Sequence, residues 1–270
     1  MSATKAKRQD LILQRLAVER EVRVEELAEQ FAVNAITVRR DLAAMEGQGR
    51  VCRTHGGAIS TRGATIEFAF RRQAQSHQAE KVAIAAAVRD RIAPGMTVSL
   101  DTGTTTLEVA RSIASVGNLK VLTSSLAIAS ALYLHENVEV VLLGGVVRGA
   151  SPDLFGMLTE ENLQRFRVDV AILGADAASP EGAFTDDVRV ARISQAMAAG
   201  GGGAILVVDS SKFRKTSFVR FAAWEDIDCV VTDDGLDAAQ RAWLERQVAR
   251  VVYASPAAGR PRAKEQAHDR

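Results

Sequence analysis

The sequence predicts a two-part chain, with a small helical head followed by a larger α/β unit built on a mostly parallel sheet. Within residues 5–45, apolar residues recur at helical spacing in three short segments. From residue 80 onward, short runs of Val, Ile and Leu alternate with amphipathic segments, as parallel strands and their connecting helices do. Small polar residues follow several of these runs, which places them at one rim of the predicted sheet.

The composition is that of a globular chain of one or two domains: 270 residues, 47% apolar and 25% charged. The net charge is +1, and residues 1–60 carry ten Lys or Arg and eight Asp or Glu, so a contact with DNA depends on where the basic residues stand. Cys52 and Cys229 are isolated, which predicts a reduced, cytoplasmic setting, no metal site and no cofactor. No apolar run is long enough to span a bilayer, so no membrane partner is expected.

The head begins with an amphipathic helix predicted over residues 5–18. Residues 22–24 read as a short extended piece, and residues 24–31 as a second helix. A tight turn at residues 32–33 leads into a third helix, which Asn34 can cap because its side-chain oxygen can accept a free N–H of the first turn. Two short helices joined by a tight turn predict a helix-turn-helix arrangement.

The third helix has the pattern of a DNA-reading helix. Its apolar stripe points into a small core and consists of Val38, Leu42 and Met45. Thr37, Arg39 and Arg40 are left on the other faces, where Arg can pair with guanine or a phosphate and Thr can contact a base edge. An Arg pair on a helix is also typical of an ordinary solvent-exposed face. The sequence on either side is therefore needed to distinguish a DNA-contacting helix from such a face.

The segment after the third helix predicts a β-hairpin. Short extended pieces surround His55-Gly56-Gly57, as in the wing of a winged helix. Arg50, Arg53 and His55 would then lie beside backbone phosphates, although His55 also fits a solvated turn. We expect Cys52 to be a small buried strand residue.

Residues 5–60 resemble the winged-helix domain of DeoR-type bacterial transcriptional regulators. The resemblance rests on FAVNAITVRRDLAAMEGQGRVCRTHGGA (residues 31–58), in which VRRDL is followed at this spacing by RTHGGA. It implies double-stranded operator DNA as a partner, contacted by Asn34, Thr37, Arg39, Arg40, Arg53 and His55. The family usually has Ser where Asn34 stands, and both residues are good helix caps.

The remainder predicts an α/β sensor unit over residues 78–254, joined to the head (residues 1–60) by a linker with some helix at 61–77. A polar tail at 255–270 is expected to be disordered. Strands are predicted at residues 97–100, 120–123, 138–143, 169–173, 204–208, 229–232 and 251–253. Helices are predicted at residues 81–92, 104–113, 126–134, 188–198 and 238–248.

The polar segment at the rim that most clearly indicates a binding site is Asp101 to Thr106. Gly103 lets the backbone approach an anion, the following helix N-terminus offers free N–H groups, and Thr104, Thr105 and Thr106 add hydroxyl donors. This is the pattern of a phosphate cradle, although the threonines also fit plain helix capping. Asp101 would accept bonds from sugar hydroxyls or hold the loop.

Further candidates follow other strands of the sheet: Ser124, Gly145, Arg148, Asp176 and Lys212. Ser124 also fits a helix cap. We expect Asp153 and Asp186-Asp187 to be loop charges and Phe155, Phe166 and Phe184 to be core residues.

This half also resembles the effector-sensing domain of DeoR-type regulators. The matching stretches occur in the same order as in the family: SLDTGTTTLEVA, LTSSLAIASAL, LLGGVVR, ILGADAAS and VVDSSKF. The family's sensing domain is similar to ribose-phosphate isomerases and amino-sugar-phosphate deaminases, which implies a phosphorylated sugar or polyol as effector of a catabolic-operon repressor. The family commonly has Asn at the position of Ser124 and an acidic residue near Val190, and both departures bear on which ligand fits.

Two other functions are compatible with parts of the sequence. A sugar-phosphate isomerase with an appended head needs a carboxylate that moves a proton between carbons, and related isomerases carry an acid where this chain has Ala177. A purely architectural DNA binder has no use for a phosphate cradle. We therefore expect a regulator with no catalytic residues, and at least a dimer, because one head covers only a short half-site.

Overall fold

The computed structural model describes residues 5–19, 21–47, 50–60, 70, 73–148 and 151–256. The chain divides into two compact units, one formed by the first 75 residues and the other beginning at Ser76. Most of the predicted linker (residues 61–69 and 71–72) and of the predicted tail (residues 257–270) lies outside the described residues. Among the described residues, none of the helices is both long and apolar enough to cross a membrane.

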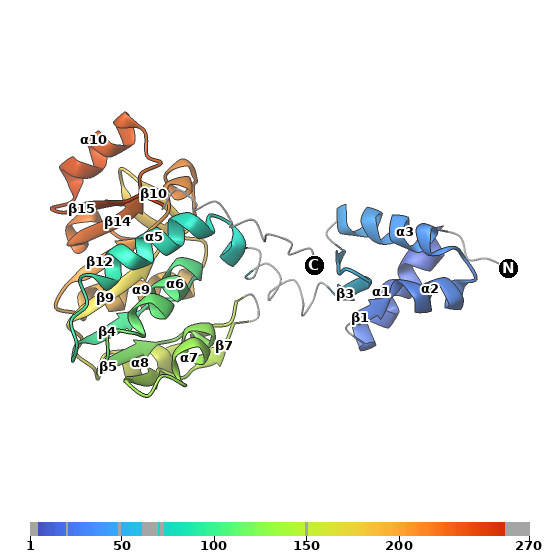
Figure 1. Ribbon diagram of the computed structural model, residues 1–270, viewed down its shortest axis with the longest axis horizontal. Helices are drawn as coiled ribbons and strands as arrows, with labels where there is room; N and C mark the ends of the chain where they lie inside the picture. Colours follow the sequence, from blue (N-terminus) through green and yellow to red (C-terminus); the bar gives the residue numbers. More distant parts are fainter. Residues whose placement is uncertain are drawn as a thin grey trace, which may run out of the picture. The chain divides into compact units, whose positions relative to one another are not determined.

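The first unit is a winged helix (Figure 1). Its elements are α1 (Lys5–Glu19), β1 (Glu21–Arg23), α2 (Val24–Phe31), α3 (Ala35–Gly47), β2 (Val51–Arg53) and β3 (Gly57–Ser60). The three strands form an antiparallel sheet in the order β1-β3-β2. The three predicted helices and the hairpin are confirmed, except that Val24 already belongs to α2, with its N–H donated to the carbonyl of Gly56.

The core of this unit is formed by the predicted apolar faces. Val38, Leu42 and Met45 of α3 are fully buried, against Ile12 of α1 and Leu27 of α2. Cys52 is buried in β2, as expected.

One polar pair lies inside the same core. The Nε atom of Arg8 in α1 donates to Oδ2 of Asp41 in α3 at 2.5 Å, and both side chains are nearly inaccessible. Asp41 belongs to the VRRDL stretch, so part of that motif holds two helices together.

The second unit is built on a seven-stranded parallel sheet with the order β15-β14-β12-β9-β4-β5-β6. Its strands are β4 (Thr97–Leu100), β5 (Leu119–Thr123), β6 (Val138–Leu142), β9 (Val170–Gly174), β12 (Ala204–Val207), β14 (Cys229–Asp233) and β15 (Val251–Ala254). Each matches a predicted strand to within one or two residues. The central strands are buried along their whole length, as a sheet covered on both faces requires.

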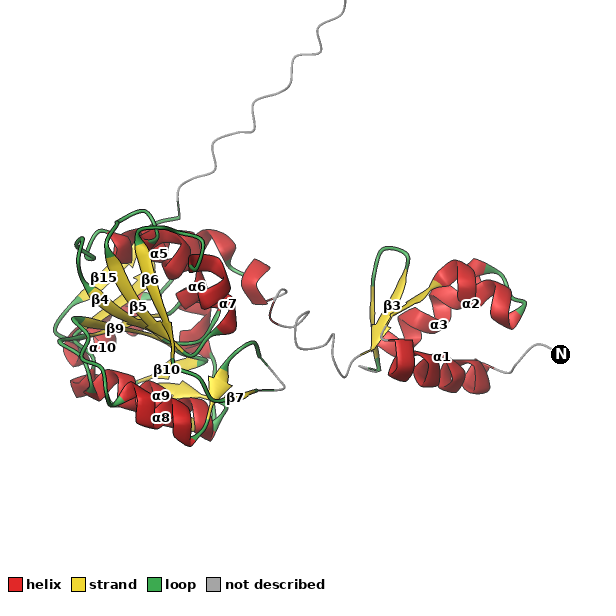
Figure 2. Ribbon diagram, turned by 90° about the horizontal axis from the view of Figure 1, so that it is seen from below, coloured by secondary structure: helices red, strands yellow, loops and turns green. Residues whose placement is uncertain are grey.

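Helices cover both faces of this sheet (Figure 2). Helices α5, α6 and α7 lie on one face, and α8 and α9 on the other. The helix bounds are α5 (Gln78–Arg89), α6 (Thr104–Ile113), α7 (Leu126–Leu132), α8 (Met157–Leu163), α9 (Val188–Ala199) and α10 (Ala238–Gln247). The helix expected at residues 81–92 begins and ends three residues earlier than predicted, and Asp90 is its C-cap.

Several short elements have no counterpart among the predictions. Strands β7 (Val146–Val147) and β8 (Leu154–Phe155) form a small antiparallel pair that leads into α8. A separate antiparallel sheet is formed by β10 (Ala177–Ser179), β11 (Gly182–Thr185) and β13 (Val219–Ala222). These strands are two to four residues long, too short to show a hydrophobic period.

Candidate functional site

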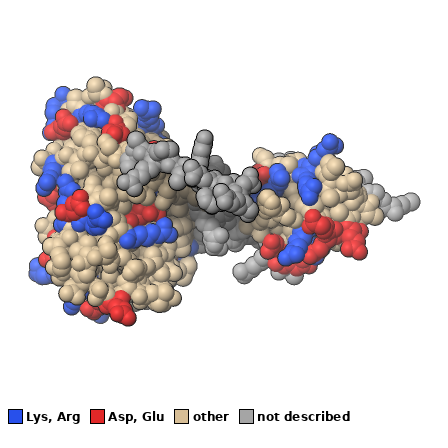
Figure 3. Space-filling view, in the orientation of Figure 1, with Lys and Arg blue, Asp and Glu red and all other residues tan. Residues whose placement is uncertain are grey.

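The exposed side of α3 carries the predicted DNA-reading residues. Asn34 caps the helix, with its Oδ1 atom accepting the N–H of Ile36 at 2.9 Å. Arg39 and Arg40 are exposed, and within the described residues neither forms an ion pair. Thr37 is half-buried beside them. Figure 3 shows basic side chains over the α3 side of this unit, whereas acidic side chains gather over the α2 side.

The wing presents Arg53 and His55 to solvent. Strand β3 requires glycine at its first residue, because a Cβ atom on Gly57 would stand 1.9 Å from the carbonyl oxygen of Val22 in β1. Arg53 is also held by α3, since its backbone N–H donates to Oε1 of Glu46 at 3.1 Å. Arg50 pairs with Asp10 of α1 at 3.1 Å, which connects the segment before the wing to α1.

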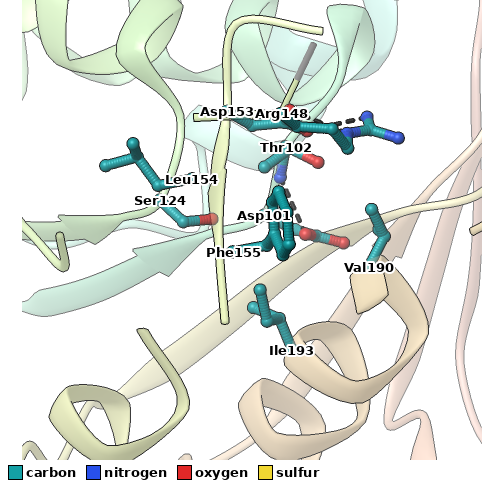
Figure 4. Close-up of a pocket in the computed structure, with 9 residues that line it drawn as sticks. All are labelled: Asp101, Thr102, Ser124, Arg148, Asp153, Leu154, Phe155, Val190 and Ile193. Carbon is teal, nitrogen blue, oxygen red and sulfur yellow. Dashed lines mark hydrogen bonds and ion pairs between the residues drawn. The ribbon is translucent and has the colours of Figure 1, made fainter. Parts of the chain in front are cut away.

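A pocket lies at the carboxyl ends of β4 and β5 in the second unit (Figure 4). The space between its lining atoms is about 200 Å³ including open solvent, and the lining side chains leave almost no room for a water molecule inside it. The rim of a parallel sheet is where ligands are expected to bind. Nine residues line it: Asp101, Thr102, Ser124, Arg148, Asp153, Leu154, Phe155, Val190 and Ile193.

Asp101 follows β4 directly and is 2% exposed. Its two carboxylate oxygens accept the N–H of Thr102 at 2.7 Å and the hydroxyl of Ser194 at 2.8 Å. Burial outweighs these bonds and raises the pKa of Asp101 to about 7. Near neutral pH this group can therefore donate or accept a hydrogen bond.

Ser124 and Ser125 follow β5 and have different roles. Ser125 caps α7, accepting the N–H of Ile128 at 3.2 Å. The hydroxyl of Ser124 is fully buried and has no hydrogen-bond partner among the described residues. Helix capping therefore does not explain Ser124. A buried hydroxyl without a partner is costly, and here it lines a pocket.

Arg148 is fully occupied by acidic partners. Its Nε and Nη2 atoms donate to the two carboxylate oxygens of Asp153 at 2.9 and 2.8 Å, and Nη1 lies 3.4 Å from Asp187. Asp187 also caps α9 and pairs with Arg189, which holds the pKa of Asp187 well below its usual range. The guanidinium of Arg189 lies over the ring of Phe155, 4.3 Å from its centroid.

The expectation that Asp153 and Asp187 are loop charges is therefore wrong. Asp153 is 2% exposed and lines the pocket. Phe155 is a wall of the pocket as well as a packed residue, and Phe166 is 39% exposed and does not belong to the core. The network of Asp153 and Asp187 around Arg148 could not be predicted from the sequence, because its members come from two segments far apart in the chain.

The start of α6 adjoins the pocket through Thr102. Gly103 stands at the N-cap position with a φ of 135°, a conformation that favours glycine, and no described side chain caps this helix. Thr104 and Thr105 are buried in the first turn. The hydroxyl of Thr106 donates to the carbonyl of Gly103 at 3.1 Å, which corrects the expectation that it serves as a free donor.

Lys212 lies in the short 3-10 helix η1 (Ser210–Arg214) after β12, outside the pocket lining. Near it is a residue that the sequence reading missed, Lys81 of α5, which is 2% exposed. Burial lowers the pKa of Lys81, the carboxylate of Asp209 opposes this, and the charge of Lys212 lowers it further. Glu108 of α6 also acts on Lys81, so Lys81 lies near α6. The available signal was that Lys81 lies on the buried, otherwise apolar face of α5, with Ile84 and Val88.

Two predicted residues have structural roles instead. Gly145 has no room for a side chain, because a Cβ atom would meet Oγ1 of Thr159 at 2.2 Å. Asp176 accepts the hydroxyl of Thr185 at 2.9 Å and the N–H of Asp186 at 3.2 Å, which ties β10 to the end of β11. Neither lines the pocket of Asp101 and Ser124, so their predicted contact with the effector stays a prediction.

Comparison with known proteins identifies both units. Residues 8–63 match the DeoR-like helix-turn-helix domain, and residues 76–234 match the DeoR C-terminal sensor domain.

Curated relatives match over most of their length. The putative aga operon transcriptional repressor of Escherichia coli O157:H7 is 34% identical over 86% of this chain and 88% of its own. The glycerol-3-phosphate regulon repressor of Escherichia coli (strain K12) is 32% identical over 78% of this chain and 84% of its own. Among solved structures, ribose 5-phosphate isomerase A from Methanocaldococcus jannaschii matches 51% of this chain and 55% of its own, with a TM-score of 0.38 and 17% identity. The chain belongs to the DeoR family of transcriptional regulators, with the family's helix-turn-helix head and its C-terminal sensor domain.

Proposed function

We propose that this protein is a repressor that releases its operator when a phosphorylated sugar or polyol binds at the rim of the sensor sheet. The observation that carries the proposal is the buried hydroxyl of Ser124, which has no partner among the described residues and lines a pocket beside Asp101. A ligand hydroxyl placed between them would satisfy Ser124 and bond to Asp101. Relatives named as repressors of the aga operon and of the glycerol-3-phosphate regulon support this class of function.

On the DNA side, we propose that α3 reads the major groove. Thr37, Arg39 and Arg40 would face the base edges, and Arg53 and His55 of the wing would lie along the phosphates. The free, exposed state of Arg39 and Arg40 within the described chain supports this assignment. The N–H groups and the cap at Asn34 would approach the adjacent backbone.

On the ligand side, we propose two neighbouring subsites. The sugar or polyol part would occupy the pocket of Asp101 and Ser124, whose acidic neighbours disfavour a phosphate. The phosphate would lie at the start of α6, on the free N–H groups that follow Gly103, with Lys212 and Lys81 balancing its charge. Arg148 is already neutralised by two carboxylates and would position the pocket wall.

For the whole chain, we propose residues 1–60 as the reading head, 61–77 as the linker, 78–254 as the sensor and 255–270 as a tail. One head covers too short a half-site for a genomic search, so at least two copies would bind each operator. Ligand binding would change the spacing of the paired heads, with a coupling of about 1–3 kcal/mol, or roughly 5- to 150-fold in operator affinity.

The DNA assignment is tested by selecting sites from a random-sequence library with the full chain, then titrating variants on the selected site. Arg39→Ala/Arg40→Ala should lower affinity by about 1–3 kcal/mol for each lost base contact. Arg39→Lys/Arg40→Lys is the matched control, because it keeps both charges but loses bidentate pairing; it should retain non-specific binding and lose sequence preference. Unchanged selected-site binding by the Ala variant would exclude α3 as the reader.

The ligand assignment is tested by thermal shift with glycerol 3-phosphate, ribose 5-phosphate, fructose 1-phosphate and galactosamine 6-phosphate, each beside its unphosphorylated form. A ligand at 100 times its Kd should add about 2.7 kcal/mol to the stability of the sensor. The same ligand should release operator DNA and should not be converted to an isomer. Asp101→Ala should still bind the operator but no longer respond. If a folded Asp101→Ala protein releases DNA at the parental ligand concentration, the pocket is not the switch.

A further inference from the structure

A large apolar side chain lies on the solvent side of helix α3. Ile36 is 55% exposed, and no other large apolar side chain among the described residues of the head is exposed to that extent. An exposed isoleucine adds little to the core, and β-branched residues form helices less readily than alanine does. A single exposed apolar residue needs no explanation by itself. The informative observation is therefore where Ile36 stands on α3.

Ile36 lies at the centre of the outward face of α3. At about 100° per residue, its side chain is on the side of the helix opposite the buried Met45. Arg39 and Arg40 follow within one turn, so one arginine lies on each side of Ile36. Both arginines are exposed, and so is Ala43 further along the same stripe. The predicted DNA-facing surface therefore has an apolar centre between two positive charges.

The start of the helix holds Ile36 in place. Its backbone N–H donates to Oδ1 of Asn34 at 2.9 Å, and the carbonyl of Asn34 accepts the N–H of Thr37 at 2.8 Å. A β-branched side chain in a helix strongly prefers one χ1 rotamer, so Ile36 loses little conformational entropy on contact with another surface. In a helix-turn-helix unit, residues at the N-terminal end of the second helix contact the base edges.

One group on the base edges of the major groove matches an apolar side chain. Purines present hydrogen-bond acceptors there, adenine and cytosine present amino donors, and all of these would lose water against isoleucine without a new partner. Thymine presents its C5 methyl group, which isoleucine can cover. Thr37 also carries a methyl group, but Thr37 is half-buried and lies about 100° away from Ile36 around the helix.

We infer that Ile36 reads a T·A base pair by packing against the C5 methyl group of its thymine. The inference rests on the proposed function, because it requires α3 to lie in the major groove. Ile36 selects the base pair through the methyl group, while Arg39 and Arg40 supply hydrogen bonds and charge on either side. The methyl contact releases no counterions, so its contribution to affinity does not depend on salt, in contrast to a phosphate contact.

The test removes the methyl group from the DNA and the side chain from the protein. A site is first selected from a random-sequence library with the full chain. Each thymine of that site is then replaced in turn by deoxyuridine, which lacks only the C5 methyl group. Kd is measured for the parent, for Ile36→Ala and for Thr37→Ser. Thr37→Ser is the matched control, because it removes a methyl group from the neighbouring residue and keeps the hydroxyl.

In the parent, deoxyuridine at one thymine of the half-site should raise Kd about fourfold, the value of burying about one methyl group. Ile36→Ala should bind the thymine and deoxyuridine duplexes equally, whereas Thr37→Ser should keep the parental ratio of the two Kd values. The slope of log Kd against log salt should be the same for Ile36→Ala as for the parent. Because Ile36 is exposed and alanine is the better helix former, Ile36→Ala should unfold at no lower temperature than the parent.

The inference is overturned if no replacement of thymine by deoxyuridine changes the parental Kd. A deoxyuridine effect that persists in Ile36→Ala, or one that Thr37→Ser abolishes, would overturn it as well. Each of these outcomes is distinct from failure of the proposed function, because loss of selected-site binding in Arg39→Ala/Arg40→Ala needs no methyl contact. A chain that selects no site from the library would overturn the proposed function and this inference together.

Discussion

Each unit of this protein buries an Arg–Asp pair, and the two pairs differ in what surrounds them. Arg8 and Asp41 join α1 to α3 inside the core of the head, with side chains 7% and 3% exposed. Arg148 and Asp153 stand at the wall of a pocket, 18% and 3% exposed, with Asp187 as a second acid. The same chemistry braces a fold in one unit and borders a ligand site in the other, so burial of a charged pair does not by itself indicate function.

The largest expected effect is at the head pair. Asp41→Ala removes the acid that faces the buried Arg8 guanidinium, which should cost about 3–5 kcal/mol of the stability of the head. Circular dichroism at 222 nm and hydrogen exchange of α1 and α3 measure this loss. Both tryptophans, Trp224 and Trp243, belong to the sensor, so Trp fluorescence should report unchanged unfolding of that unit.

The double variant Arg8→Met/Asp41→Leu is the control for this change. Replacing both charges by apolar groups of similar size should restore most of the loss. A double variant as unstable as Asp41→Ala would show that the head needs the ion pair itself and not only apolar packing at these two positions.

At the pocket, the pH dependence of sensor stability should follow Asp101. Its pKa of about 7 when folded lies above the ordinary value of about 3.9. Between these pH values the folded state holds a proton that the unfolded state has released. The contribution of Asp101 to the unfolding free energy of the sensor therefore falls as pH rises, by up to about 1.4 kcal/mol per pH unit. Above pH 7 this contribution no longer changes with pH.

Asp101→Asn is the comparison for that slope, because it keeps the shape of the side chain and cannot titrate. The difference in unfolding free energy between the Asp101→Asn variant and the parent, followed by Trp fluorescence in urea, should grow from pH 5 to pH 7. A constant difference across that range would assign the pH dependence to other groups.

The two pairs can be compared directly through Asp153→Ala. Arg148 keeps Asp187 at 3.4 Å and some access to water, so the cost to the sensor should be about 1–3 kcal/mol, less than Asp41→Ala costs the head. Urea unfolding followed by Trp fluorescence measures it. A cost equal to or above that of Asp41→Ala would remove the distinction between a closed pair and a pocket pair.

Local patterns predicted most of the fold, because helices and parallel strands of this length carry their own periodicity. The reading helix with Val38, Leu42 and Met45 and all seven strands of the main sheet were expected from such patterns. What could not be predicted depends on contacts between distant positions. Arg8 and Asp41 are 33 residues apart, and nothing near either one indicates the other.

The pocket was predicted in part for the same reason. Asp101 and Ser124 each follow a strand directly, so the topology alone brings them to one rim. Asp153 and Phe155 lie after a two-residue strand that has no detectable pattern, and Val190 and Ile193 reach the pocket from α9. Gly145 and Asp176 follow strands as well, but packing against Thr159 and Thr185 occupies them.

The smallest expected effect concerns two buried hydroxyls, one that is proposed to bind the ligand and one that is not. Ser124 and Ser99 both have buried hydroxyls without a partner among the described residues, but only Ser124 lines the pocket. Without ligand, Ser124→Ala and Ser99→Ala should both leave stability within about 1 kcal/mol of the parent, because each removes an unsatisfied group. With the phosphosugar found by thermal shift, Ser124→Ala should weaken binding by about 0.5–1.5 kcal/mol, the net value of one hydrogen bond, and Ser99→Ala should not. Isothermal titration calorimetry of the two variants and the parent gives the three Kd values, and equal Kd values for Ser124→Ala and the parent would place the ligand elsewhere.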